Sequence, residues 1–154
     1  MLDVPQITNT EAQRTARIHL TIPRAEIQNV MGPGIQEVLA ALADQGIEPT
    51  GPWLTHHLTI SPDVFDFDIC VPVTVEVLPV GRVTAGMLPA AQVARTIYRG
   101  GYEGLGATWG ELGSWIVASG YTAAPDLWEC YVVGPESSSH PADWQTQLNR
   151  PLVS

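Results

Sequence analysis

The chain has 154 residues, of which 45% are hydrophobic and 15% are charged, and this composition predicts one folded domain spanning residues 1–154. The formal net charge is −9, and all 7 basic residues are arginines, scattered from Arg14 to Arg150. Because binding to a phosphate backbone requires clustered positive charge, this distribution argues against a nucleic-acid partner and favours cationic partners.

Targeting signals and disulfides are not expected either. No apolar run reaches the roughly 18 residues that suggest a membrane span, and the first residues lack the features of a signal peptide. Cys70 and Cys130 both lie in strand-like segments, which is typical of free buried thiols in a reducing compartment. We therefore expect a cytoplasmic protein without a membrane partner.

The first half of the chain predicts a strand, a helix and two further strands. Residues 1–11 resemble a leader with no fixed partner, and 13–22 form a β-branched strand. A helix is predicted from about Gly34 to Gln45, because apolar residues recur at helical spacing and Gly46 is a natural stop. The two strands that follow are predicted at 53–60 and 65–75.

The second half predicts the same order of elements. Residues 83–87 and 91–99 resemble one strand interrupted near Pro89, and 102–119 a helix that stops at Gly120. The apolar stripe of this helix contains Leu105, Trp109, Leu112 and Ile116. The remaining predicted segments are the strand 127–133, the loop 134–140 and the strand 144–152.

The recurrence of strand, helix, strand, strand predicts an α+β fold built from a duplicated unit. The halves lie at about 12–76 and 82–152, and their helices stop at Gly46 and Gly120. We expect the halves to be related by a pseudo-two-fold axis, with a ligand groove between them.

Strand alternation selects the side chains that would line this groove. Alternate residues of a strand point to opposite faces, so 127–133 has one apolar face containing Trp128 and another containing Glu129 and Tyr131. We expect the helix to cover the apolar face, which leaves Glu129 and Tyr131 facing the groove. In 53–60 the same argument assigns Leu54, Leu58 and Ile60 to the helix side and Trp53, Thr55 and His57 to the groove, and His56 does not fit.

An aromatic groove with a carboxylate suits a flat, lipophilic cation. Stacking and cation–π contacts contribute roughly 0.5–2 kcal/mol each. An ionised carboxylate in an apolar cleft is costly unless it is paired, so the groove would select a positive ligand.

Several motifs of the second half occur in a distinctive order and spacing. They are Tyr98-Arg99-Gly100-Gly101-Tyr102-Glu103, Trp109, Trp115-Ile116, Glu129-Cys130-Tyr131, Gly134-Pro135 and Pro151-Leu152. Together they resemble the gyrase-inhibitor-like (GyrI-like) effector-binding domain family, and the likeness covers about residues 12–152, including the stretch 67–73 of the first half. The bacterial members of this family include stand-alone proteins and the effector domains of multidrug-responsive transcription regulators.

The resemblance implies a duplicated strand–helix–strand–strand fold that binds lipophilic, often cationic, aromatic molecules. It also implies that Glu129, in the family's Glu-x-Tyr strand, is the acidic ligand contact, with Tyr131 beside it. The chain departs from the family at His57, where tyrosine is frequent, and at Gln147, where glutamate is frequent. These departures leave Asp68 as a second acidic candidate.

The leading interpretation is a stand-alone protein that binds bulky aromatic cations as a sensor or sequestering module. Trp109 is a further candidate ligand contact, although its place on the apolar helix stripe favours core packing. Two alternatives stay open. One is an enzyme that hydrolyses strained cyclopropane rings of genotoxic natural products, with Glu129 positioning or deprotonating water. The other is a protein-interaction module that acts on a large partner such as DNA gyrase.

No cofactor or metal is expected. Neighbouring strand residues such as His56 and His57 point to opposite faces, so they cannot easily share one ion. The Gly100-Gly101 pair lacks the spacing and the lysine of a nucleotide-binding loop. No serine or cysteine lies in a recognisable nucleophile motif.

Overall fold

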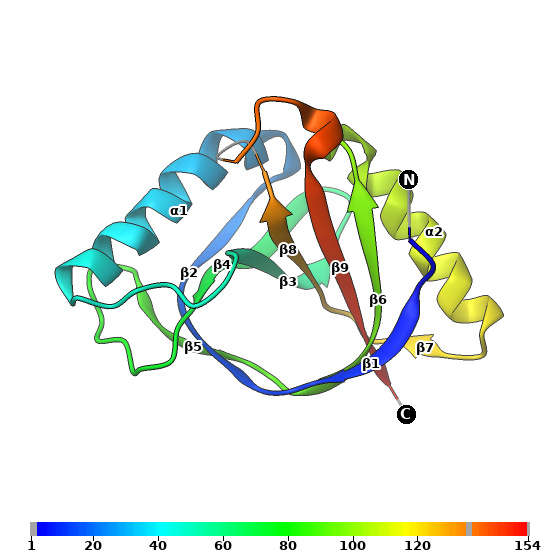
Figure 1. The fold of residues 1–154 in the computed structure, drawn as a ribbon, viewed down its shortest axis with the longest axis horizontal. Coiled ribbons are helices and arrows are strands. Elements are labelled where there is room, and N and C mark those ends of the chain that lie inside the picture. Colours follow the sequence, from blue (N-terminus) through cyan, green and yellow to red (C-terminus); the bar gives the residue numbers. More distant parts are fainter. Residues whose placement is uncertain (1–2, 135–136, 154) are drawn as a thin grey trace. The chain divides into compact units, whose positions relative to one another are not determined.

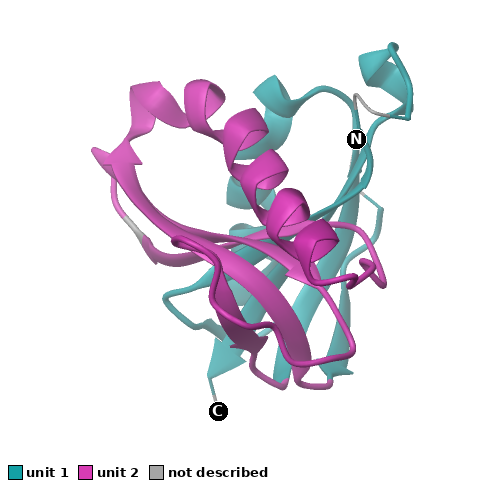
Figure 2. Cartoon of the chain, turned by 90° about the vertical axis from the view of Figure 1, so that its left-hand side faces the viewer, with its two compact units in different colours: residues 1–10, 91–154 teal, residues 11–90 magenta. Residues whose placement is uncertain are grey.

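The computed structural model describes residues 3–134 and 137–153, which form two compact units. Unit 1 consists of residues 1–10 and 91–154, and unit 2 of residues 11–90 (Figure 2). Each unit combines an antiparallel sheet with a helix, so the predicted α+β class is confirmed. The duplication, its symmetry and the single domain stay predictions. Residues 1–2 of the predicted leader and 135–136 of the predicted loop lie outside the described residues.

Unit 2 contains four antiparallel strands in the order β3-β4-β2-β5. Their bounds are β2 (Gln13–Pro23), β3 (Leu54–Ile60), β4 (Val64–Pro72) and β5 (Thr84–Leu88). After β2, the 3-10 turn η1 (Arg24–Glu26) leads into helix α1 (Ile27–Asp44) (Figure 1).

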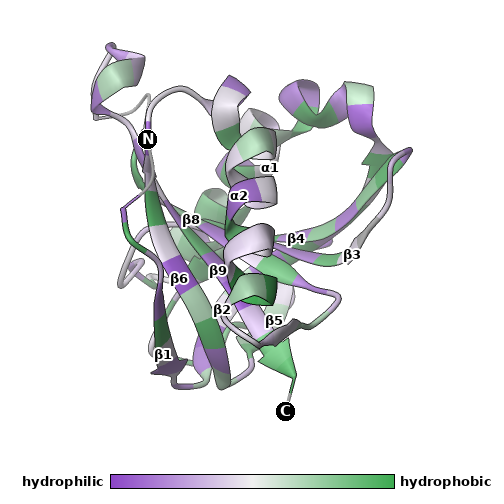
Figure 3. Cartoon of the chain, turned by 90° about the vertical axis from the view of Figure 1, so that its right-hand side faces the viewer, coloured by the Kyte–Doolittle hydropathy of each residue, from purple (hydrophilic) through white to green (hydrophobic). Residues whose placement is uncertain are grey.

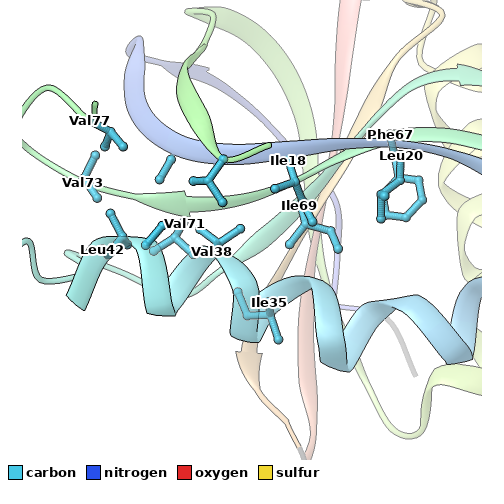
Figure 4. Close-up of a cluster of buried hydrophobic side chains, with 13 residues drawn as sticks. Ile18, Leu20, Ile35, Val38, Leu42, Phe67, Ile69, Val71, Val73 and Val77 are labelled. Atoms are coloured by element: carbon cyan, nitrogen blue, oxygen red, sulfur yellow. The ribbon is translucent and has the colours of Figure 1, made fainter. Parts of the chain in front are cut away.

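The core of unit 2 lies between α1 and one face of this sheet (Figure 4). Gly34 permits the close approach, because a Cβ there would lie 2.5 Å from Cδ1 of Ile69 on β4. Burial of its apolar face stabilises such a helix more than intrinsic propensity does. The buried members include Ile35, Val38 and Leu42 of α1, Ile18 and Leu20 of β2, and Phe67, Ile69 and Val71 of β4.

Helix α1 begins seven residues before the predicted start at Gly34. Pro33, which lacks an amide hydrogen and disfavours a helix interior, lies inside α1. The added turns nevertheless contribute Ile27, Val30 and Met31 to the edge of the core. Tertiary packing therefore outweighs the local signal of proline flanked by glycines.

The described residues of unit 1 form an antiparallel sheet with the strand order β1-β6-β9-β8. A short additional strand, β7, pairs with β9. The 3-10 turn η2 (Tyr102–Gly104) leads into helix α2 (Leu105–Ala118), and η3 (Pro141–Asp143) precedes β9. The strands are β1 (Gln6–Thr10), β6 (Ala91–Arg99), β7 (Thr122–Ala123), β8 (Leu127–Val133) and β9 (Gln145–Val153).

Two sequence predictions about the strands are wrong. The leader 1–11 contains β1, which pairs along its whole length with β6, and Thr96 Oγ1 donates to the Asp3 carbonyl at 2.7 Å. The supposed interrupted strand at 83–99 consists of two strands, because β5 pairs with β2 in unit 2 while β6 pairs with β1 and β9 in unit 1. Both results are long-range pairings, which local composition does not encode. Figure 3 shows both hydrophobic (green) and hydrophilic (purple) bands along β6.

None of the helices formed by the described residues is long and apolar enough to cross a membrane. Cys70 is buried and Cys130 is partly buried.

Candidate functional site

The carboxylate of Glu129 in β8 is buried, with 9% of the residue exposed. Trp109 of α2 donates its indole N–H to Oε2 at 2.6 Å, and the Tyr131 hydroxyl donates to Oε1 at 2.8 Å. Burial raises the pKa of Glu129 and outweighs these two hydrogen bonds, which lower it. The structure therefore brings three predicted site residues of unit 1 together around one costly buried charge.

Glu129 and Tyr131 lie on the face of the sheet that α2 covers, which reverses the predicted orientation. In the ladder between β8 and β9, Glu129 lies opposite Leu148, and Leu148 packs in one core cluster with Leu112 and Ile116 of α2. Residues directly opposite each other share a face of the sheet. Alternation correctly predicts which residues share a face, but it does not identify the face that the helix covers.

The opposite face of β8 is less apolar than its own sequence indicates. Trp128 lies opposite Asn149, a buried residue whose side chain accepts a hydrogen bond from Arg95 Nε at 2.6 Å. Burial raises the pKa of the Cys130 thiol, on this face, to about 11. Such a thiol stays protonated at neutral pH and is a poor nucleophile.

Two aromatic side chains that the sequence interpretation missed extend the cluster around Glu129. The ring of Tyr102 lies 5.8 Å from the ring of Tyr131 at an interplanar angle of 70°, and 4.8 Å from Trp144. Trp144 in turn donates its indole N–H to the Ser138 carbonyl at 2.9 Å. Neither residue lies in the two strands from which groove residues were selected. The sequence feature that could have indicated this extension is Tyr102, the aromatic residue directly after Gly100-Gly101.

Glycines shape the turn that precedes α2. Gly100 has a φ of +139°, which favours glycine, and the Tyr98 hydroxyl donates to the Gly101 carbonyl at 2.8 Å. A Cβ at Gly104 would collide with that hydroxyl. The glycines of this turn therefore allow Tyr98 to pack under the start of the helix.

In unit 2, the predicted residues Trp53, Thr55 and His57 lie on the α1 face, which again reverses the predicted orientation. Thr55 lies opposite Ile69 and His57 opposite Phe67, both members of the core under α1. The register between β3 and β4 then shifts between His57 and Thr59, so strict alternation ends there. Trp53 packs against the same core.

His57 is buried and electrically neutral at physiological pH. Its ring stacks on Phe67 at 5.1 Å and meets Phe65 edge-on at 5.5 Å. Burial, followed by the positive charges of His56 and Arg24, lowers the pKa of His57 to about 4. This face of unit 2 is therefore aromatic and carries no charge from His57 near neutral pH.

Asp68 lies on the other face of the unit 2 sheet and is not brought together with His57. Its carboxylate pairs with Arg17 Nη1 at 2.8 Å and with His19 Nδ1 at 2.8 Å. His56 lies opposite Asp68 in the ladder, which explains why this histidine does not fit an apolar face. Over residues 3–134 and 137–153, no three histidine, cysteine or acidic residues are placed to hold a metal ion.

Two physical effects make the surroundings of Glu129 more favourable for a positive group than for a negative one. A buried carboxylate gains from a positive partner that restores the solvation it has lost. Aromatic faces attract cations through their quadrupole, most strongly where water is excluded. Unit 1 contains such rings in Tyr131, Tyr102, Trp109 and Trp144.

Comparison with known proteins identifies a family and a fold. A family profile described as "GyrI-like small molecule binding domain" matches residues 4–152. No protein with a curated description matches the sequence.

Three solved proteins illustrate the shared fold. The C-terminal domain of EcmrR matches with a TM-score of 0.87 at 19% identity, over 98% of each chain. The EcmrR chain in its complex with DNA matches with a TM-score of 0.85 at 20% identity, and this protein spans 57% of that chain. A hydrolase from Listeria innocua matches with a TM-score of 0.69 at 12% identity, over 97% of this chain and 91% of its own. SAV2435, bound to tetraphenylphosphonium, matches with a TM-score of 0.67 at 13% identity, over 99% and 95%.

Proposed function

The chain belongs to the GyrI-like small-molecule-binding family, and from that premise we propose that it binds lipophilic aromatic cations through the carboxylate of Glu129. It acts in the cytoplasm as a sensor or sequestering protein, and it binds its ligand without turnover. The tetraphenylphosphonium bound by SAV2435 has this chemistry. It is therefore a suitable probe for this protein.

The observation that carries the proposal is the buried Glu129 carboxylate with an aromatic donor on each oxygen. Its raised pKa indicates that the surrounding protein does not compensate the negative charge fully. A cation placed against this group would supply the missing compensation. The formal net charge of −9 adds a long-range attraction for positive ligands.

In unit 2, Trp53 and His57 stay predicted stacking residues, and Thr55 stays a predicted polar contact. Because the pKa of His57 is about 4, its ring stays neutral and does not repel a cation near neutral pH. Asp68 is not part of the proposed contact set, since Arg17 and His19 already pair with it.

The test is to titrate tetraphenylphosphonium into the wild type, Glu129→Gln and Glu111→Gln by calorimetry. Glu111 is an exposed residue of α2, so its variant removes an equal charge without touching the site. Loss of one partner of a desolvated charge pair costs about 2–5 kcal/mol. We expect at least about a tenfold loss of affinity for Glu129→Gln and little change for Glu111→Gln. Equal losses in the two variants would contradict the proposal.

Glu129→Gln should not destabilise the free protein at neutral pH. The folded-state pKa of Glu129 is raised, so any stability tied to this group is present below the unfolded pKa and is lost as pH rises through the folded value. At neutral pH the variant removes an unfavourable buried charge. Its melting temperature should therefore equal or exceed that of the wild type, which separates lost binding from lost folding.

A second candidate function rests on the same raised pKa. A carboxyl group with a pKa shifted toward neutrality is suited to general acid–base catalysis, as a hydrolase of strained rings would require. Incubation with a cyclopropane-containing alkylating agent, followed by mass spectrometry, tests it. A product that gains one water in the wild type and is absent with Glu129→Gln would replace the binding proposal with an enzymatic one.

A further inference from the structure

A buried hydroxyl beside the Glu129 cluster has no partner within the described part of the chain. Thr146 of β9 is 0% exposed, and its Oγ1 forms no hydrogen bond with any residue that the structure describes. The hydroxyls of the two residues opposite Thr146 donate their hydrogens to other acceptors. Tyr98 donates to the Gly101 carbonyl, and Tyr131 donates to Glu129. Buried polar atoms without a partner are rare in folded proteins and call for an explanation.

The sheet register places Thr146 next to the proposed cation site. Thr146 lies directly between Tyr98 of β6 and Tyr131 of β8. Glu129 pairs with Leu148, two residues further along β9, so Thr146 and Glu129 are diagonal neighbours on the α2 face. Diagonal neighbours in a ladder have Cβ atoms roughly 7 Å apart. A molecule that contacts Glu129 and stacks on Tyr131 would therefore lie within reach of Thr146.

The choice of threonine is unfavourable for the free protein. Valine has nearly the same shape and would fill this position without burying an unpaired hydroxyl, which is destabilising when it has no partner. This hydroxyl would instead contribute favourably to ligand binding if a bound molecule supplied the missing hydrogen-bond partner. Its place beside Glu129 indicates where that molecule lies.

We propose that Thr146 determines specificity, by forming a hydrogen bond with a polar substituent of the cation that Glu129 holds. This inference rests on the proposed function and narrows its ligand class. The preferred ligands are aromatic cations that carry a hydrogen-bonding group, such as a ring amine, several ångströms from the positive charge. Aromatic cations without such a group bind through charge and stacking alone.

The test compares two cations of the same ring system. Ethidium carries two ring amines, and 5-ethyl-6-phenylphenanthridinium is the same cation without them. We expect Thr146→Val to weaken ethidium binding about five- to tenfold, which is the range for one hydrogen bond, and to leave the deaminated cation unchanged. Thr146→Ser should restore ethidium binding. Free Thr146→Val should melt at or above the wild-type temperature.

Each contrary outcome has a separate meaning. If both cations bind the wild type and Thr146→Val weakens both equally or neither, the assignment of Thr146 is wrong while the proposed function stands. A clear drop in the melting temperature of free Thr146→Val would also overturn the assignment, because the hydroxyl would then be stabilising the fold. If neither cation binds the wild type, the proposed function fails and this inference fails with it.

Discussion

Replacing His57 with phenylalanine tests whether this side chain is neutral inside unit 2. His57 is 9% exposed and stacks on Phe67, so phenylalanine can occupy the same position and keep the ring contacts. Burial lowers the pKa of His57 in the folded state from its ordinary value of 6.5 to about 4. The native state therefore binds fewer protons than the unfolded state between these values. It follows that the free energy of unfolding decreases as the pH falls from about 6.5 to about 4.

The size of this effect follows from the two pKa values. A pKa difference of one corresponds to about 1.36 kcal/mol, so the full penalty is on the order of 3 kcal/mol. Between about pH 7 and about pH 4.5 the wild type should lose about 2 kcal/mol more than His57→Phe. Urea denaturation of both proteins at the two pH values measures this difference, and the carboxylates common to both cancel.

His56→Gln is the matched control, because His56 lies next to His57 in sequence but on the opposite face of β3. It should keep the wild-type pH dependence, apart from a small change through its charge. If the wild type and His57→Phe lose the same stability on acidification, His57 is not buried as a neutral ring.

Three further predictions follow from the packing and charge of unit 1. Gly104→Ala should destabilise the protein by about 1–3 kcal/mol in thermal or urea unfolding, because its Cβ collides with Tyr98. Trp128→Ala should cost about 3–5 kcal/mol of stability, since Trp128 is buried on the face opposite Glu129, and the folded fraction should keep its affinity for tetraphenylphosphonium. The affinity of the wild type for this cation should rise as pH increases through the raised pKa of Glu129, and calorimetry of Glu129→Gln should give a flat profile.

Strand and helix positions were largely predictable because hydrophobic periodicity is a local property. The strand β8 and the end of α1 lie within a residue of their predicted places. The pairing partners of β1 and β5 were not predictable, because they are set by contacts distant in sequence. The early start of α1 also depends on tertiary packing, which maintains the helix through Pro33.

In the candidate site too, the arrangement of side chains within one strand is predictable from the sequence, whereas contacts between strands are not. Alternation grouped Glu129 with Tyr131, and Thr55 with His57, and each pair does share a face. The predicted choice of face is wrong in both units, because apolar residues such as Trp128 and Leu54 do not by themselves identify the face that the helix covers. The neighbouring strands determine which face the helix covers, because they place core residues opposite Glu129 and His57.

We propose that the charge of Glu129 selects positive ligands. Two ions of equal shape and opposite charge test this selectivity most directly. Tetraphenylphosphonium and tetraphenylborate differ in the sign of their charge while presenting the same four phenyl rings. Calorimetric titration of the wild type should give at least about a tenfold preference for the phosphonium, and Glu129→Gln should remove most of it. Equal binding of both ions by the wild type, or a preference that survives in Glu129→Gln, would contradict the account.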